Sequence, residues 1–396
     1  MLRYFFITLV SILFSLYLFE FYLPYKEKLS QEQLIKEQLL REKRYENQSG
    51  KKWDKRTTLQ VYDDLKKTKN DIVVRFQPSY NLGKKKIPIF PLSGISNSDS
   101  IHCNENGYFT IYQSDRYGFN NPDEEWESEE IEYLLVGDSL THGSCVNRPN
   151  DIASVLRTLS GKSTLNLGYG GNGPLIEYAV LREYSNSNIK KILWIYGESN
   201  DLFDLRVELK NKNLLEYLNS KNHSQNLRER QFEIDNLLKT NLKAELEKVI
   251  FKEELNVKSQ IEKDNKLKYK ILKFIRLDKT KKIFEKKNTN YDESVFQEFE
   301  KILRLSLKLS KENNAKLIFV YIPEFRRYSG TKYSDENYNK IVSIVKKLDI
   351  KLIDMKQFFD NQKNPKSFFP FGLFAWHYNI EGYRKIGEMI YQSTKD

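Results

Sequence analysis

The chain has 396 residues, of which 39% are hydrophobic and 13% aromatic. This composition supports a sizeable packed core and excludes a wholly disordered chain, while 17 Gly, 10 Pro and 2 Cys exclude collagen-like and disulfide-scaffold proteins. The net charge is +11, and residues 206–292 hold 22 Lys/Arg against 14 Asp/Glu. Such a basic segment suits an anionic partner, which could be nucleic acid, lipid headgroups or an acidic glycan.

The N-terminal segment predicts a membrane helix. Arg3 precedes an uncharged run over residues 4–19, and Glu20 is followed by further apolar residues up to Pro24. A bilayer span takes ~20 apolar residues. Because no small-residue cleavage site follows the run, we favour an uncleaved signal anchor over residues 1–25, with a cleaved signal peptide as the alternative. Residues 26–69 predict a charged helical stalk.

The remainder of the chain predicts an α/β fold. Residues 70–130 alternate short apolar stretches with Pro, Gly and Asn clusters, which indicates an irregular, β-containing lead-in. The hydrophobic pattern then predicts strands at 131–136, 164–167, 189–196, 317–322 and 350–353, and helices at 151–159, 174–184, 296–312, 335–347 and 380–392. Strands that alternate with helices predict a doubly wound parallel sheet in a three-layer sandwich.

A long segment interrupts this alternation within the domain at 131–396. Residues 202–292 contain no Gly or Pro and are rich in Leu, Lys, Glu and Asn. We therefore expect a mostly helical insertion. Its Lys residues are interspersed with Glu and form no recognition motif, so no nucleic-acid partner is expected.

Four short motifs lie directly after predicted strands or before the last predicted helix. They are Gly137-Asp138-Ser139-Leu140, the Gly-rich run at 168–173, Gly197-Glu198-Ser199-Asn200-Asp201, and Ala375-Trp376-His377-Tyr378. Because the carboxyl ends of parallel strands meet at one edge of a sheet, we expect these motifs to converge there. Taken alone, Ser139 is equally suited to be a helix N-cap.

The order Ser, Gly, Asn, His along the chain resembles the SGNH (GDSL-type) hydrolase superfamily, over roughly residues 130–396 without the insertion. The lead-in, with Cys103-Asn104-Glu105 and the run at 114–122, looks like that of membrane-tethered bacterial members. The resemblance implies a flavodoxin-like SGNH fold and a serine hydrolase. It assigns Ser139 as nucleophile and His377 as general base.

The same resemblance implies an oxyanion hole. Its donors would be the main-chain N–H groups of Ser139 and Gly171 and the side-chain amide of Asn200. Gly170 is an alternative to Gly171 as the donor, because both lie in the same Gly-rich run.

The sequence departs from the family pattern at two points. An Asp usually lies three residues before the His, but Phe374 occupies that position. The ring of His377 could be oriented by Asp354, by Asp360 or by a backbone carbonyl, or the site could work as a Ser-His dyad. In addition, two residues instead of one separate the Gly and the Asn in the third motif.

The other chemistry-bearing residues predict no cofactor. His102, His142 and His223 lack metal-ligand spacing with Cys or acidic residues, so no metal is expected. No phosphate-binding loop or dinucleotide fingerprint is present in the sequence. Cys103 and Cys145 could form a disulfide in an oxidising compartment, whereas they would remain thiols in the cytoplasm.

These expectations combine into a membrane-anchored serine esterase or O-acyl(acetyl)transferase that acts on a cell-envelope glycan or lipid. Hydrolysis and transfer remain open because they share one acyl-enzyme. The alternative is a catalytically weak binding or assembly protein of the envelope. The Lys and Arg residues after the predicted span favour a cytoplasmic domain, whereas the resemblance favours an extracytoplasmic one, which we expect. Oligomeric state and the role of the insertion are not predicted.

Overall fold

The computed structural model describes residues 2–84, 87–259, 274, 276–277, 291–330 and 333–395. It comprises two compact units. One contains Met1–Arg44 and Lys243–Asn290, and the other contains Tyr45–Leu242 and Tyr291–Asp396. The second unit holds both sheets and all of the predicted site residues.

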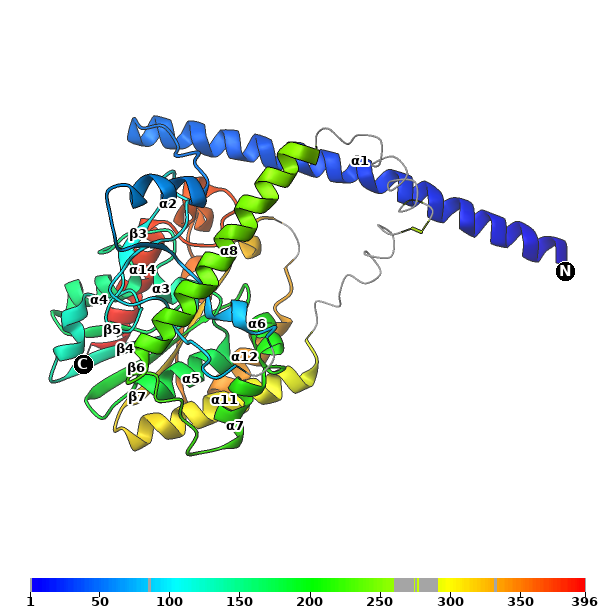
Figure 1. Ribbon diagram of the computed structural model, residues 1–396. Helices are drawn as coiled ribbons and strands as arrows, with labels where there is room; N and C mark the ends of the chain where they lie inside the picture. Colours follow the sequence, from blue (N-terminus) through cyan, green and yellow to red (C-terminus); the bar gives the residue numbers. More distant parts are fainter. Residues whose placement is uncertain are drawn as a thin grey trace. The chain divides into compact units, whose positions relative to one another are not determined.

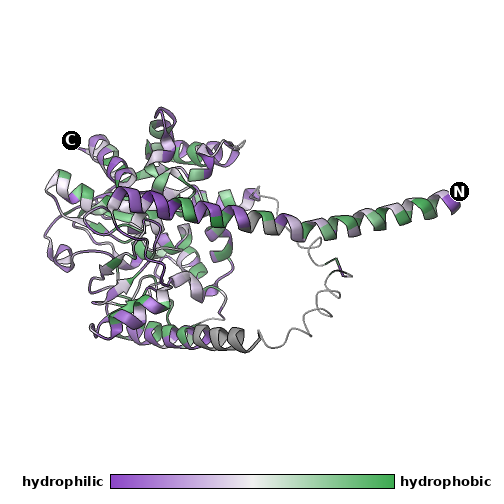
Figure 2. Ribbon diagram, turned by 90° about the horizontal axis from the view of Figure 1, so that it is seen from above, coloured by the Kyte–Doolittle hydropathy of each residue, from purple (hydrophilic) through white to green (hydrophobic). Residues whose placement is uncertain are grey.

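The N-terminal helix α1 extends over Leu2–Ser49 without interruption at Pro24 (Figure 1). Its segment Arg3–Lys26 is long and apolar enough to cross a membrane, by length and composition. Figure 2 shows hydrophobic residues along the N-terminal part of α1 and mainly hydrophilic residues toward its other end. The predicted anchor and the first half of the predicted stalk are therefore one continuous helix.

The centre of the second unit is a five-stranded, wholly parallel sheet in the order β5-β4-β6-β7-β8. The strands are β4 (Ile131–Gly137), β5 (Thr164–Asn166), β6 (Ile189–Gly197), β7 (Lys316–Ile322) and β8 (Lys351–Asp354). Strands β4 and β6 are buried along most of their length, as expected for strands covered on both faces. The doubly wound sheet expected from the sequence is confirmed.

Helices cover both faces of this sheet. They are α4 (Ile152–Ser160), α5 (Pro174–Tyr184), α11 (Glu293–Glu312), α12 (Glu336–Lys347) and α14 (Ile380–Thr394), with the short α13 (Met355–Asp360) after β8. Helix α14 packs against α4, whereas α11 packs against α5 and α12. The apolar face of α14, with Tyr383, Ile386 and Ile390, is fully buried in the main core against strand residues such as Leu135 and Leu193.

The lead-in forms a second, smaller sheet. It contains α2 (Thr58–Lys66), β1 (Ile72–Val74), β2 (Asp99–Ile101) and β3 (Ile111–Gln113). Strand β2 pairs parallel with β1 and antiparallel with β3. The 3-10 turns are η1 (Pro78–Asn81) and η2 (Asp123–Glu127) in the lead-in, and η3 (Phe325–Tyr328), η4 (Pro365–Phe368) and η5 (Pro370–Gly372) beyond β7.

The predicted insertion is mostly helical where it is described, with non-helical segments at 209–211 and 220–230. It contains α6 (Asp201–Glu208), α7 (Lys212–Asn219) and α8 (Gln231–Ser259), and residues 260–273, 275 and 278–290 lie outside the described residues. Both α6 and α7 pack against α5. The Arg182 guanidinium on α5 donates to four carbonyl oxygens between Tyr217 and His223. Within the insertion, residues up to Leu242 belong to the sheet unit, whereas Lys243–Asn290 belong to the other unit.

Candidate active site

Ser139 begins the one-turn helix α3 (Ser139–His142) directly after β4. Asp138 caps this turn, because its Oδ1 accepts from the Leu140 N–H at 2.9 Å. The Ser139 hydroxyl donates to Asp138 Oδ2 at 3.3 Å. Ser139 is partly exposed at the carboxyl end of β4, while both of its neighbours are buried. An N-cap role belongs to Asp138 and not to Ser139.

The Gly-rich loop after β5 packs closely on α3. A Cβ on Gly168 would lie 2.4 Å from Thr141 Cβ, and the Tyr169 N–H donates to Gly137 O at 3.1 Å. Gly171 has φ +82°, a left-handed conformation that favours glycine. Among the residues that the structure describes, the main-chain N–H groups of Ser139 and Gly171 have no protein acceptor. Both are therefore available as donors.

Gly170, the alternative donor position, has a different environment. Its carbonyl oxygen accepts from Arg75 Nη1 at 3.5 Å, and a Cβ at this position would lie 2.3 Å from the same nitrogen. The Arg75 guanidinium also lies 5.4 Å from the centre of the Tyr169 ring. The carbonyl of Gly170 thus links the Gly-rich loop to Arg75 of the lead-in. Gly171 is the residue of this pair that has a left-handed backbone conformation.

Asn200 lies in the turn between β6 and α6. Its Nδ2 donates to Asp204 Oδ2 at 2.7 Å, and the Ser199 hydroxyl donates to its Oδ1 at 2.6 Å. These two bonds fix the amide and leave one amide hydrogen for a further acceptor. Burial raises the pKa of Asp204 to about 7. A Cβ on Gly197 would lie 3.4 Å from atoms of Asp138 and Leu140, so this turn lies beside the turn that carries Ser139.

The extra residue of this motif, Glu198, has a structural role. Its carboxylate accepts from the Tyr321 hydroxyl at 2.6 Å, from the Glu324 N–H at 3.1 Å and from Arg327 Nε at 3.0 Å. The Glu198 and Arg327 side chains are 6% and 7% exposed. The additional residue therefore ties the end of β6 to the loop after β7.

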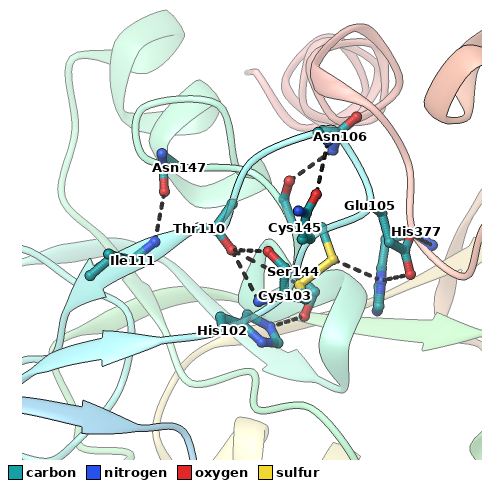
Figure 3. Close-up of a disulfide and its surroundings, with 12 residues drawn as sticks. His102, Cys103, Glu105, Asn106, Thr110, Ile111, Ser144, Cys145, Asn147 and His377 are labelled. Carbon is teal, nitrogen blue, oxygen red and sulfur yellow. Dashed lines mark hydrogen bonds and ion pairs between the residues drawn. A yellow bond between two sulfur atoms is a disulfide. The ribbon is translucent and has the colours of Figure 1, made fainter. Parts of the chain in front are cut away.

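His377 lies in the loop before α14 and contacts a carboxylate that sequence reasoning missed. Its Nδ1 is 3.1 Å from Glu105 Oε1, and its main-chain N–H donates to Glu105 Oε2 at 3.1 Å (Figure 3). The side chains of His377 and Glu105 are 14% and 16% exposed. Glu105 belongs to the lead-in, between β2 and β3. The one feature of the sequence that could have pointed to Glu105 is its position two residues after Cys103.

The expectation that Asp354 or Asp360 orients His377 is corrected by this contact. Asp354 caps α13 through the Lys356 N–H at 3.0 Å and accepts from the Tyr338 hydroxyl at 2.6 Å. Asp360 pairs with Lys356 Nζ at 2.7 Å. Both acids lie on or beside a short helix whose own groups they stabilise.

Phe374, at the position of the family's usual Asp, is part of an aromatic cluster. Its ring centre is 5.8 Å from that of Phe325 and 5.2 Å from that of Trp376. The Arg326 guanidinium lies 5.2 Å from the Phe374 ring centre. This side chain therefore packs against the main core.

Cys103 and Cys145 form a disulfide, with their Cα atoms 5.2 Å apart. Cys145 Sγ also lies 3.5 Å from His377 Nδ1 (Figure 3). The loop that carries His377 thus packs on the segment that begins with Ser139. The two sulfurs and the His377 ring are close enough for a metal site, but sulfurs bonded to each other are not the thiolate ligands that such a site requires.

Two further histidines lie near the α3 turn, of which His142 is buried and His102 is partly exposed. His102 Nε2 is 2.7 Å from Ser144 Oγ, and His142 Nδ1 is 3.3 Å from Gly168 O. Burial lowers the pKa of His142 to about 3 and holds the pKa of His102 well below its ordinary value. These rings are packing and hydrogen-bonding groups next to the α3 turn.

The lead-in supports the site through buried amides. Asn120 Nδ2 donates to His142 O and Asn121 Nδ2 donates to Asn166 O, both at 2.9 Å. Asp115 holds this segment by accepting from Asn121 Nδ2 and Trp126 Nε1, each at 2.8 Å. The motif at 114–122 is therefore a scaffold for the loops after β4 and β5.

Carboxyl groups are buried beneath the Gly-rich loop. Glu208 accepts from the N–H groups of Gly173 at 2.6 Å and Leu175 at 2.9 Å, which satisfies the first turn of α5. Burial raises the pKa of Glu208 to about 8. Burial and the nearby Asp201 hold the pKa of Glu177 well above its ordinary value. Neither carboxyl oxygen of Glu177 has a hydrogen-bond partner among the described residues.

Comparisons with known proteins give weak likenesses. No protein-family model matches the chain, and no curated protein matches it. A solved structure from Desulfitobacterium hafniense DCB-2, assigned to the G-D-S-L lipolytic family, is 13% identical, covering 66% of this chain and 99% of that one, with a TM-score of 0.35. The acetyl xylan esterase AlAXEase is 12% identical, covering 67% and 100%, with a TM-score of 0.35. The lipase/acylhydrolase from Enterococcus faecalis is 11% identical, covering 66% and 94%, with a TM-score of 0.34.

These identities and TM-scores do not establish the activity of this chain. The chain order of the loops that carry Ser139, Gly171, Asn200 and His377 is the pattern on which the resemblance to the SGNH (GDSL-type) hydrolases rests.

Proposed function

We propose that the chain is an SGNH-type serine hydrolase that forms an acyl-enzyme on Ser139 and either hydrolyses it or transfers the acyl group. The observation that carries this proposal is the position of Ser139. It lies partly exposed at the carboxyl end of β4, in a turn that contacts Gly168 of the Gly-rich loop and Gly197 of the turn that carries Asn200. The loop of His377 packs on the same segment through Cys145.

In this mechanism the Ser139 hydroxyl oxygen attacks the carbonyl carbon of an ester. His377 accepts the hydroxyl proton through Nε2, because its Nδ1 faces Glu105. The negative charge that forms on the carbonyl oxygen is stabilised by the N–H groups of Ser139 and Gly171 and the remaining amide hydrogen of Asn200.

The tetrahedral intermediate then collapses, the carbon–oxygen bond to the alcohol breaks, and His377 returns the proton to the leaving oxygen. A water molecule or an acceptor hydroxyl resolves the acyl-enzyme, again with His377 as base. Hydrolysis and transfer differ only in this acceptor. Small O-acyl groups, acetyl first, on a cell-envelope glycan or lipid are the proposed substrates.

The proposed location is a single-pass membrane protein with an extracytoplasmic domain. The apolar segment Arg3–Lys26 supports the anchor, and the Cys103–Cys145 disulfide supports an oxidising compartment. The alternative of a binding or assembly protein arose because no acid precedes His377. The contact with Glu105 removes that reason.

A fluorophosphonate probe tests the proposal on the full-length chain in detergent. We expect labelling of the wild type and hydrolysis of p-nitrophenyl acetate, with both lost in Ser139→Ala. The matched control is Ser160→Ala, a partly exposed serine at the end of α4, which should behave like the wild type. Equal labelling of the wild type and Ser139→Ala, or no labelling at any pH, would contradict a Ser139 nucleophile.

A further inference from the structure

The carboxylate of Glu105 contacts His377 at two points. One oxygen lies 3.1 Å from the ring nitrogen Nδ1, and the other accepts from the main-chain N–H of the same residue at 3.1 Å. A single carboxylate thus contacts both the ring and the backbone of His377, which restricts the rotation of the ring. Both side chains are less than one-fifth exposed, so water competes little for these contacts.

We propose that Glu105 is the positioning residue of the Ser139–His377 pair, supplied by the lead-in in place of the acid that the family carries three residues before its His. This inference rests on the proposed function. A carboxylate on Nδ1 keeps the proton there, so that Nε2 is the free base, and it stabilises the imidazolium that forms when Ser139 is deprotonated.

Three links hold Glu105 in this place. The Cys103–Cys145 disulfide joins the chain two residues before Glu105 to the segment after α3. The Asn106 side chain donates to Cys145 O at 2.8 Å, directly after Glu105 in sequence (Figure 3). His102 contacts Ser144 at 2.7 Å on the other side of the disulfide. Residues on both sides of Glu105 are therefore fixed to the segment that follows Ser139.

The base of the loop is also anchored on its outer side. The Asn104 side chain donates to Asp54 O at 2.8 Å and accepts from the Gly107 N–H at 2.9 Å. Gly107 has φ +94°, and a Cβ there would lie 2.5 Å from the Tyr45 ring. The chain is thus turned back tightly after Glu105, which leaves the carboxylate at the tip of a restrained loop.

This arrangement makes the lead-in part of the catalytic apparatus and not only an outer layer. A sheet domain without residues 102–106 would retain Ser139 and His377 but would lack the carboxylate on Nδ1. The disulfide then has a role in activity as well as in stability, because it determines where Glu105 lies.

The test compares Glu105→Gln, Glu105→Asp and Ser139→Ala in the full-length chain. Glu105→Gln keeps the size of the side chain but removes the charge, and we expect kcat to fall by ~10³–10⁴-fold with KM changed less than about threefold. Glu105→Asp should recover at least ~10-fold of that loss. The matched control Glu129→Gln makes the same chemical change at an exposed lead-in position and should keep wild-type kinetics.

A second readout reports the ring itself. In the chain labelled with ¹⁵N-histidine, wild-type His377 should carry its proton on Nδ1, and Glu105→Gln should shift it toward a mixture of tautomers. His377→Gln identifies the resonance. A purely structural role for Glu105 would lower stability without changing the tautomer.

The outcomes separate the two proposals. If Ser139→Ala abolishes activity but Glu105→Gln retains kcat within about threefold and keeps the wild-type tautomer, the role of Glu105 is overturned and the proposed hydrolase stands. If Glu105→Gln does not fold, Glu105→Asp decides: a lower kcat together with a mixture of His377 tautomers supports the role, and lower stability with the wild-type tautomer and wild-type kcat refutes it. If the wild type itself has no Ser139-dependent activity, the proposed function fails first.

Discussion

His377 Nδ1 and Glu105 Oε1 lie 3.1 Å apart although 272 residues separate them in the chain. The contact joins the last loop of the sheet domain to a loop of the small lead-in sheet. It supplies the carboxylate that the sequence near His377 lacks, because Phe374 stands where an acid would be expected and packs into the core.

The disulfide should affect both stability and activity. It closes a loop with a sequence separation of 42, for which chain entropy predicts a loss of ~4 kcal/mol in the free energy of unfolding when it is removed. We expect the double variant Cys103→Ser/Cys145→Ser to lose this stability in urea unfolding and at least ~10-fold in kcat. Wild-type kcat in the folded double variant would show that the disulfide is not needed to position Glu105.

Asn200→Ala should lower kcat by ~10²–10³-fold with little change in KM, because its free amide hydrogen is proposed to bind the oxyanion only as charge develops. Steady-state kinetics on p-nitrophenyl acetate measures this. Asn236→Ala, at an exposed position of α8, is the control and should be neutral. A rise in KM at constant kcat would instead assign Asn200 to substrate binding.

Glu198→Ala should destabilise the protein by ~3 kcal/mol, because it leaves the Arg327 guanidinium buried without this partner and removes the acceptor of the Tyr321 hydroxyl. Chemical denaturation measures the change. The control is Glu381→Ala, which removes the acid of an exposed ion pair with Arg384 on α14. It should change the free energy of unfolding by less than ~1 kcal/mol. Equal effects of the two variants would contradict a special role for the longer turn.

Glu177 predicts a pH dependence of stability. Burial raises its pKa well above 4.5, so the folded chain retains a proton that the unfolded chain has lost. Stability from this group is therefore fully present below pH ~4.5 and falls as the pH rises toward the folded pKa. Glu177→Gln, a neutral side chain of the same shape, should match the wild type near pH 4 and exceed its free energy of unfolding by ~1–3 kcal/mol at pH 8.

Urea unfolding of the wild type and Glu177→Gln at pH 4, 6 and 8 measures this difference. The neighbouring acids Asp201 and Glu208 remain in both proteins, so their own titration contributes to both curves. A difference that is constant with pH, or that falls as the pH rises, would show that Glu177 is ionised in the folded chain.

Local patterns in the sequence were sufficient for most of the fold. Helix α5 has the predicted bounds, and β4 and β6 each extend one residue beyond theirs, because apolar periodicity and Gly or Pro boundaries are properties of neighbouring residues. The same holds for the contacts that Gly168 and Gly197 make with the turn after β4, since parallel strands present their carboxyl ends on one edge. The composition of the N-terminal segment was likewise sufficient to predict a helix long and apolar enough to cross a membrane.

The sequence by itself therefore determined the parallel sheet, the loops that carry the proposed nucleophile and the proposed amide donors, and the apolar N-terminal helix. Only the tertiary structure decided which acid faces His377 and what the extra Glu198 binds. These contacts join residues more than 100 positions apart, and no local period or spacing encodes a pairing that depends on how separate elements pack.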